Sequence, residues 1–248
     1  MIVAVHQPHF LPWLGYLDRM RQADLFIVLD HVQFERRNYQ NRTRIKLDGQ
    51  PHWITVPVQQ HSQQERIVDK RIDNPPPGEA RWWGANLCRT LKHAYRDAEF
   101  LDDYAPALCR ILESRWDRLV DLDAAALGFL REAYGIRTPI TTSTALGVAG
   151  AKSDLILNLC IAAGADTYLA GMGGSRDYLD REAFAEAGVS LAWQAFEHPR
   201  YAQGAGEFIP GLSSIDMLMR AGPQAGRLLA EASTGERSAP QRAGLAAA

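Results

Sequence analysis

The sequence predicts an α/β protein with an open, mostly parallel sheet, flanking helices and an inserted helical segment. Short apolar runs without alternation recur along the chain, as is typical of strands buried on both faces of a parallel sheet. Segments of helical periodicity separate these runs. Gly164 and Gly188 follow two of the helical segments, where a left-handed cap is expected.

The elements of the predicted sheet come from both ends of the chain. Strands are expected at Met1–Val5, Leu25–Leu29, Thr138–Thr142, Thr167–Ala170 and Val189–Phe196. The helices that connect or follow them are expected at Leu14–Gln22, Lys152–Ala163 and Arg181–Ala187. The first two strands and the helix between them therefore form one crossover unit, and the later segments extend the same sheet.

The middle of the chain is predicted to be a helical insertion at about residues 80–133, because apolar residues there recur at helical spacing. A chain of 248 residues with 46% hydrophobic residues can bury a core without disulfides. No linker is visible, so we expect a single domain over residues 1–232. Residues 233–248 carry few large apolar groups and are expected to be a disordered tail.

Charge and cysteine content narrow the class of protein. The net charge of -2 offers no general attraction for nucleic acid, and no stretch reaches the roughly 20 apolar residues of a membrane span. The N-terminus lacks the basic region of a signal peptide, so a cytoplasmic location is expected. Cys88, Cys109 and Cys160 are widely spaced, which argues against a disulfide framework and against a zinc site, and no metal is expected.

Candidate functional residues follow the predicted strands. Ligands of open α/β sheets bind outside the carboxyl ends of the strands, so polar residues that close the apolar runs are the first candidates. These residues are His6, Gln7, His9, Trp13 and Tyr16 after the first strand, Asp30 and Gln33 after the second, Ser143 after the third, and Gly171, Gly173, Gly174, Arg176 and Tyr178 after the fourth.

The two histidines of the first loop are candidates for acid–base chemistry. Prolines on either side restrict the loop, and imidazoles titrate near neutral pH. We expect His6 to be a general base, with His9 as a second catalytic candidate and Asp30 supporting His6. The alternative is that the loop packs against the following helix, with one imidazole bonded to a backbone carbonyl.

Two segments are candidates for binding an anionic group. The glycine-rich turn Gly171–Gly174 precedes a helical segment, and Arg176 can add a bidentate contact, although the turn can also be only a turn. The segment from Arg36 to Lys46, with Asn41 and Arg42, holds five basic residues after Glu35. It can clamp a phosphate-bearing donor or the acidic surface of a carrier protein, or it can be a solvated hairpin whose basic side chains form one wet face.

Two further residues are weighed for direct roles. Cys160 lies in a predicted helix with apolar residues at core spacing, so a structural thiol is expected, and it would carry an acyl group only in a covalent mechanism. Lys152 precedes Ser153, the expected N-cap of the same helix, and can reach a ligand or be solvated.

Several ordered motifs resemble the WbqC-like protein family over residues 1–222. The motifs are His6-Gln7-Pro8, Pro12-Trp13-Leu14-Gly15-Tyr16, Asp30-His31-Val32-Gln33-Phe34, Asn41-Arg42, Lys152-Ser153-Asp154, Tyr168-Leu169-Ala170-Gly171, Tyr178-Leu179-Asp180, Tyr201 with Gln203, and Phe208-Ile209-Pro210. The resemblance implies a bacterial protein of surface-polysaccharide or specialised-metabolite biosynthesis that transfers an acyl or aminoacyl group. It adds Tyr201 and Gln203 to the substrate-binding candidates.

The resulting hypothesis is an acyl or aminoacyl transferase that makes an amide or ester on a small-molecule acceptor. An acyl or peptidyl carrier protein is a candidate partner, and no cofactor is specified. A nucleotidyl transferase of the adenylate-forming type is an alternative, because such enzymes also begin with a strand, a histidine-containing loop and a helix. A non-catalytic substrate-binding subunit is the third.

Overall fold

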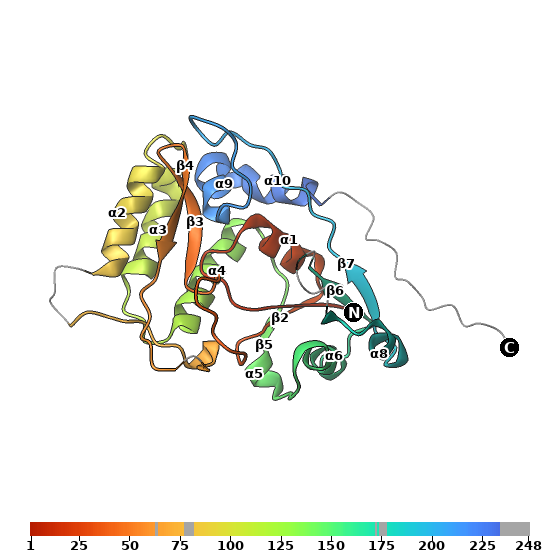
Figure 1. The fold of residues 1–248 in the computed structure, drawn as a ribbon. Coiled ribbons are helices and arrows are strands. Elements are labelled where there is room, and N and C mark those ends of the chain that lie inside the picture. Colours follow the sequence, from red (N-terminus) through yellow and green to blue (C-terminus); the bar gives the residue numbers. More distant parts are fainter. Residues whose placement is uncertain (63, 77–81, 172, 174–177, 234–248) are drawn as a thin grey trace.

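The computed structural model describes residues 1–62, 64–76, 82–171, 173 and 178–233 of the chain. Its centre is an all-parallel five-stranded sheet of order β5-β2-β1-β6-β7, which confirms the predicted α/β class (Figure 1). The strands are β1 (Ile2–His6), β2 (Leu25–Val28), β5 (Ile140–Thr142), β6 (Thr167–Ala170) and β7 (Ser190–Trp193). β6 has the predicted bounds, and β2, β5 and β7 are shorter than the predicted runs. β1 begins one residue later than predicted and extends one residue further, to His6.

The strands are continuous apolar runs because both faces of the sheet are covered. Ala4 and Phe26 point into a core shared with helix α1 (Leu14–Gln22), whereas Val3 and Ile27 point into a core on the opposite face. Helices α6 (Lys152–Ala162) and α8 (Arg181–Glu186) contribute to that second core. The central strand β1 is thus buried between two layers of helices, and its carboxyl end can be reached only from the sheet edge.

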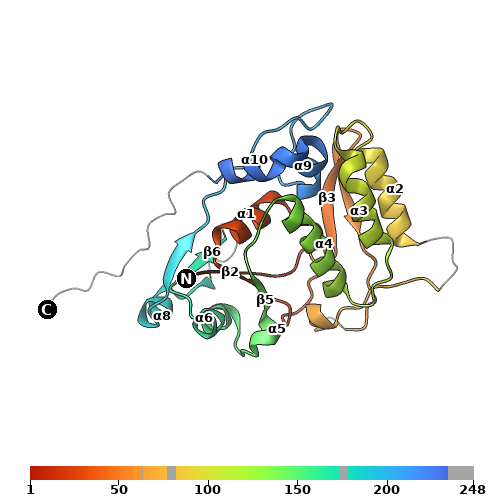
Figure 2. The ribbon, with the colours of Figure 1, turned by 180° about the vertical axis from the view of Figure 1, so that it is seen from behind.

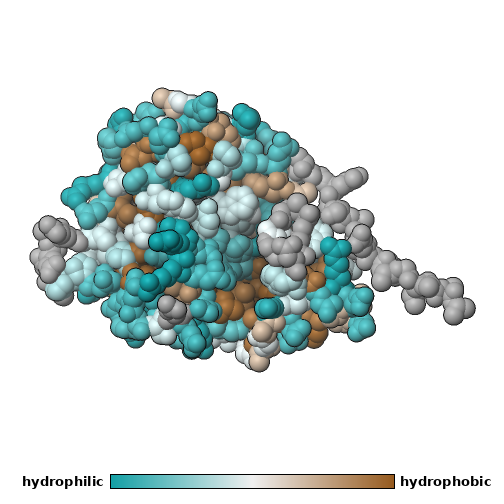
Figure 3. Space-filling view, in the orientation of Figure 1, coloured by the Kyte–Doolittle hydropathy of each residue, from teal (hydrophilic) through white to brown (hydrophobic). Residues whose placement is uncertain are grey.

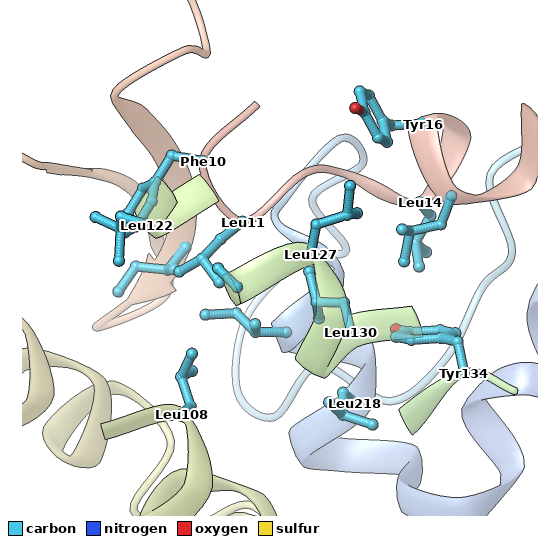
Figure 4. Packing of buried hydrophobic residues seen from close by; sticks show 14 of the residues in the cluster. Phe10, Leu11, Leu14, Tyr16, Leu108, Leu122, Leu127, Leu130, Tyr134 and Leu218 are labelled. Atoms are coloured by element: carbon cyan, nitrogen blue, oxygen red, sulfur yellow. The ribbon is translucent and has the colours of Figure 1, made fainter. Parts of the chain in front are cut away.

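The predicted insertion forms three helices at one end of the molecule. These are α2 (Trp83–Ala94), α3 (Leu101–Glu113) and α4 (Leu119–Ala133), and α2 and α3 lie at the end opposite α8 in both views (Figure 1, Figure 2). Leucines of α4 pack between Leu108 of α3 and the loop that follows β1, so the insertion and one sheet layer share a continuous apolar core (Figure 4).

An antiparallel hairpin and the C-terminal segment complete this layer. Strands β3 (Arg42–Leu47) and β4 (Gln50–Thr55) form the hairpin, which α2 contacts. After β7 the chain returns to the hairpin and continues into α9 (Ser214–Ala221) and α10 (Ala225–Glu231). Short helical turns are α5 (Ser143–Leu146), η1 (Ile67–Asp69) and η2 (Gly222–Gln224).

Two local predictions are wrong. The basic side of β3 is not a wet face, because the returning segment covers it: Lys46 is 3% exposed and donates to Glu207 O, and Arg44 donates to Gly211 O. Helix α6 has Ala151 rather than Ser153 as its N-cap, since the Ser153 hydroxyl accepts from the Asp180 N–H instead.

The molecular surface is largely polar on the face shown in Figure 3. None of the helices within the described residues is long and apolar enough to cross a membrane. Hydrophilic residues cover most of the face seen in Figure 3, with apolar residues in separate patches. Residues 234–248 of the expected tail lie outside the described residues.

Asp123 of α4 makes stability depend on pH. It is 2% exposed, neither carboxyl oxygen has a hydrogen-bond partner in the described part of the chain, and burial raises its pKa well above the usual range. Above the unfolded pKa of about 3.9, the unfolded state releases a proton that the folded state keeps, so the free energy of unfolding falls as pH rises, by about 1.4 kcal/mol per pH unit up to the folded pKa.

We predict that Asp123→Asn removes this loss of stability, because an amide does not titrate. Urea unfolding at pH 5 and pH 7 should show a smaller decrease for the variant than for the parent. Asp103→Asn, at an exposed position on α3, is the control and should follow the parent. Equal pH dependence in parent and Asp123→Asn would contradict the prediction.

Candidate functional site

A cavity of about 490 Å³ opens at the carboxyl ends of β1 and β6. It lies where the sheet order reverses, because β1 leads to β2 on one side and pairs with β6 on the other, and such switch points bind ligands in open α/β sheets. Its wall is formed by Val5, His6, Gln7, Trp13, Gly15, Tyr16, Arg19, Leu29, Ile156, Tyr168, Gly171, Gly173, Tyr178, Gln194 and Phe196.

His6 is the histidine of this wall. It is the last residue of β1, and its Nδ1 lies 3.0 Å from Gln7 O. A carbonyl oxygen only accepts, so this contact requires the proton on Nδ1. In the neutral imidazole, Nε2 then keeps its lone pair, which is the state that a general base needs.

His9 is packed behind His6 rather than on the cavity wall. The two ring centroids are 4.5 Å apart in an edge-to-face arrangement, and His9 also stacks between Tyr16 and Tyr39. His9 is 7% exposed, and burial lowers its pKa to about 3. It is therefore a neutral ring near pH 7, and its contribution is to hold His6 and Tyr16 in place.

Asp30 caps a helix and has no described contact with His6. Its Oδ1 accepts from the Ser143 hydroxyl at 2.9 Å, the Thr144 N–H at 2.9 Å and the Thr144 hydroxyl at 2.8 Å. Ser143 also lies 2.6 Å from His31 Nδ1. Asp30 and Ser143 thus fix the start of α5, and neither residue is on the cavity wall.

The basic segment makes internal contacts away from the cavity. Arg36 donates to Gln60, Asn41 donates to Val56 O, and the Arg42 guanidinium lies 4.0 Å from the centroid of the Trp53 ring. Arg42 also donates to the carbonyls of Arg37 and Asn38. With Lys46 bonded to the returning segment, these residues organise the hairpin.

The remaining candidates divide between the wall and the scaffold. Those on the wall are Gln7, Trp13, Tyr16, Gly171, Gly173 and Tyr178. Those away from it are Gln33, whose backbone bridges to Arg66, Lys152 at the exposed start of α6, Tyr201, which donates to Asp216, and Gln203, which bonds both backbone groups of Ile209. Gly174 and Arg176 lie outside the described residues.

The sequence analysis missed Arg19, Tyr168, Gln194 and Phe196 of the wall. Arg19 lies in α1 and is 6% exposed, although an amphipathic surface helix would turn such a residue to water. Helical spacing places Asp18, Arg19 and Gln22 together on the polar side of the helix, so the local sequence carried no signal for the burial of Arg19.

The three cysteines are buried, and none lies on the cavity wall. Cys160 in α6 is fully buried, and burial raises the pKa of its thiol to about 12. A thiol in this state is not a nucleophile at neutral pH. Among the described residues, no group of three or more histidine, cysteine, aspartate or glutamate side chains could hold a metal ion.

We predict that Asp30→Ala lowers the free energy of unfolding by about 2–3 kcal/mol, because three donors at the start of α5 lose a charged acceptor. Denaturant unfolding measures the change. Asp154→Ala, an exposed acid in the first turn of α6, is the matched control and should cost less than about 0.5 kcal/mol. If Asp30→Ala is as stable as the parent but inactive, Asp30 has a catalytic role instead.

Comparison with known proteins identifies the family. The family model described as the WbqC-like protein family matches residues 7–228. An uncharacterized protein of Mycobacterium tuberculosis (strain ATCC 25618 / H37Rv), Rv1507c, is 32% identical over 226 residues, which cover 90% of this chain and 95% of that protein. No solved structure matches. The chain belongs to the WbqC-like protein family.

Proposed function

We propose that the protein is an acyl or aminoacyl transferase that forms an amide or ester on a small acceptor, with His6 as the general base. The observation that carries the proposal is the position of His6 on the cavity wall, with Nδ1 3.0 Å from Gln7 O, a contact that leaves Nε2 of the neutral ring as a proton acceptor. The family resemblance supports a role in bacterial polysaccharide or specialised-metabolite biosynthesis.

The cavity suits a small organic molecule. Its volume of about 490 Å³ lies in the range of small-ligand sites. Trp13 and Phe196 meet edge to face at 5.6 Å on the wall and supply an apolar surface, while His6, Gln7 and Gln194 supply polar groups. Apolar walls with a few polar groups position a ligand for reaction.

The proposed reaction transfers the group directly from donor to acceptor. His6 Nε2 takes the proton of the acceptor amine or hydroxyl as the acceptor attacks the donor carbonyl carbon. A C–N or C–O bond forms, the bond from that carbon to the leaving group breaks, and the leaving group receives the proton from His6. The buried thiols give no covalent route, and an acyl or peptidyl carrier is one form of donor that fits this scheme.

We predict that His6→Ala lowers the rate of transfer by about 10²–10⁴, the usual contribution of a general base. Mass spectrometry would follow amide or ester product from a panel of acyl thioesters and acyl or aminoacyl adenylates with amine and hydroxyl acceptors. His61→Ala removes an exposed histidine and should match the parent. A rate of His6→Ala within a few-fold of the parent would exclude the base role.

The same assay separates the alternative functions. Pyrophosphate release from ATP without amide or ester product would indicate a nucleotidyl transferase. Binding of a small molecule without any turnover would indicate a non-catalytic binding subunit. Either outcome overturns the transferase proposal.

We predict that Cys160→Ser keeps more than half of the parent activity, because its thiol is buried and un-ionised near pH 7. Intact-protein mass spectrometry of the parent with the donor should show no added acyl group. A trapped thioester on the parent, together with an inactive but folded Cys160→Ser protein, would establish a covalent mechanism instead.

A further inference from the structure

The guanidinium of Arg19 lies on the wall of the cavity and has no role in the proposed reaction. Arg19 of α1 is 6% exposed, and its Nε has no hydrogen-bond partner in the described part of the chain. No carboxylate of the described residues forms an ion pair with it. Burial lowers the pKa of Arg19, but an arginine keeps its proton at neutral pH. The cavity therefore contains a desolvated positive charge.

The neighbouring acid on the same helix cannot neutralise this charge, because its oxygens are already used. Asp18 is fully buried and accepts from Gln22 Nε2 at 2.6 Å and Gln194 Nε2 at 2.7 Å through Oδ2. Its Oδ1 accepts from Arg21 and Ser233. Buried charges in proteins are paired with protein groups or with ligands, because an unpaired one loses its hydration.

The end of β6 is shaped around the Arg19 side chain. A Cβ atom at Gly171 would lie 2.4 Å from Arg19 Nη1, which is closer than real Cβ atoms approach. Glycine at position 171 thus allows the guanidinium to lie against the backbone at the carboxyl end of β6, next to the ligand space. Tyr168 of β6 and Tyr178 lie near the same charge and also line the cavity.

The position of Arg19 relative to His6 limits the shape of the ligand. Tyr16 and Arg19 are three residues apart on α1 and share a face of the helix, and the Tyr16 ring is 4.7 Å from the His6 ring. Arg19 and His6 line the same cavity, so an anionic group near Arg19 and a nucleophile near His6 can belong to one small molecule.

We infer that Arg19 binds an oxyanion of the substrate, a carboxylate or a phosphate group, on the same molecule as the amine or hydroxyl that His6 activates. The inference rests on the proposed function for the role of His6, and on the cavity alone for the binding of the anion. Arginine pairs with either oxyanion through two parallel N–H donors. An amino acid or hydroxy acid, or its phosphate counterpart, is the corresponding substrate class.

Binding of simple probes tests the inference without turnover. Benzoate and inorganic phosphate represent the two oxyanions, benzamide is the neutral counterpart of benzoate, and ligand-observed NMR gives the dissociation constants. We expect benzoate or phosphate to bind the parent at least tenfold more tightly than Arg19→Met, and benzamide to be insensitive to the substitution. The anion that binds more tightly identifies carboxylate or phosphate as the natural group.

Four further variants isolate the charge and its position. Arg227→Met removes an exposed cation of α10 that is not on the cavity wall, and it should bind the anions like the parent. Arg19→Lys should recover part of the affinity, because a point charge replaces the planar fork. Gly171→Ala keeps the charge but displaces it and should weaken anion binding, whereas Gly128→Ala, with open space around the new methyl group, should not.

Thermal stability supplies a readout that separates a ligand-binding arginine from a structural one. Without added anion, Arg19→Met should melt at or above the temperature of the parent, by up to about 2–4 °C, because it removes a buried charge that has no ion-pair partner among the described residues. Anion should raise the melting temperature of the parent and not that of Arg19→Met. A structural arginine would give the opposite, a lower melting temperature for Arg19→Met with unchanged anion affinity.

The failure of this inference is distinguishable from that of the transferase proposal. Equal affinity of the parent for benzoate, phosphate and benzamide, or equal anion affinity of parent and Arg19→Met, would overturn the anion site whatever the activity. Anion binding that depends on Arg19 would uphold it even if no transfer product is found. Transfer product together with equal anion affinity of parent and Arg19→Met would uphold the transferase and overturn the anion site.

Discussion

The buried carboxylate of Asp18 fixes the position of the helix on which the cavity depends. Through its two oxygens, it joins α1 to Gln194 at the exit of β7 and to Ser233 beyond α10. Gln194 also donates to Gly15 O, so the same amide bonds the first turn of the helix. A buried carboxylate is stable only with such donors. This network therefore sets where the Tyr16 and Arg19 side chains meet the ends of β1 and β6.

Pairing, rather than the number of charges, determines which cation is available to a ligand. The basic segment contains the densest positive charge in the sequence, yet Lys46 and Arg44 donate to the carbonyls of Glu207 and Gly211. Those bonds close the returning segment over the hairpin. The Asp18 carboxylate beside Arg19 has a full set of donors, while the Arg19 Nε has no acceptor among the described residues. The cation that is available to a ligand is thus Arg19, which lies in the buried helix α1.

The local pattern of apolar residues predicted the sheet and the strand ends at which the site lies. Buried parallel strands are continuous apolar runs, and their carboxyl ends share one edge of the sheet. His6, Trp13 and Tyr178 were found in this way. The errors came from contacts between residues far apart in the sequence. Asp30 caps a helix that begins 113 residues later, and the segment that covers Lys46 lies 161 residues further along the chain. Nothing in the local spacing around either residue indicates its partner.

The same argument explains why Arg19 was invisible to helical periodicity. A periodic pattern assigns one buried face to a helix, but every residue of α1 from Leu14 to Met20 is buried, because the sheet, the β7 exit and α10 enclose it. In such a helix a cation is retained at a cost in stability, and a selective advantage must offset that cost. Binding of an anionic ligand provides that advantage, because the bound anion neutralises the positive charge of Arg19. Arg19 then lowers the stability of the free protein and raises its affinity for the ligand.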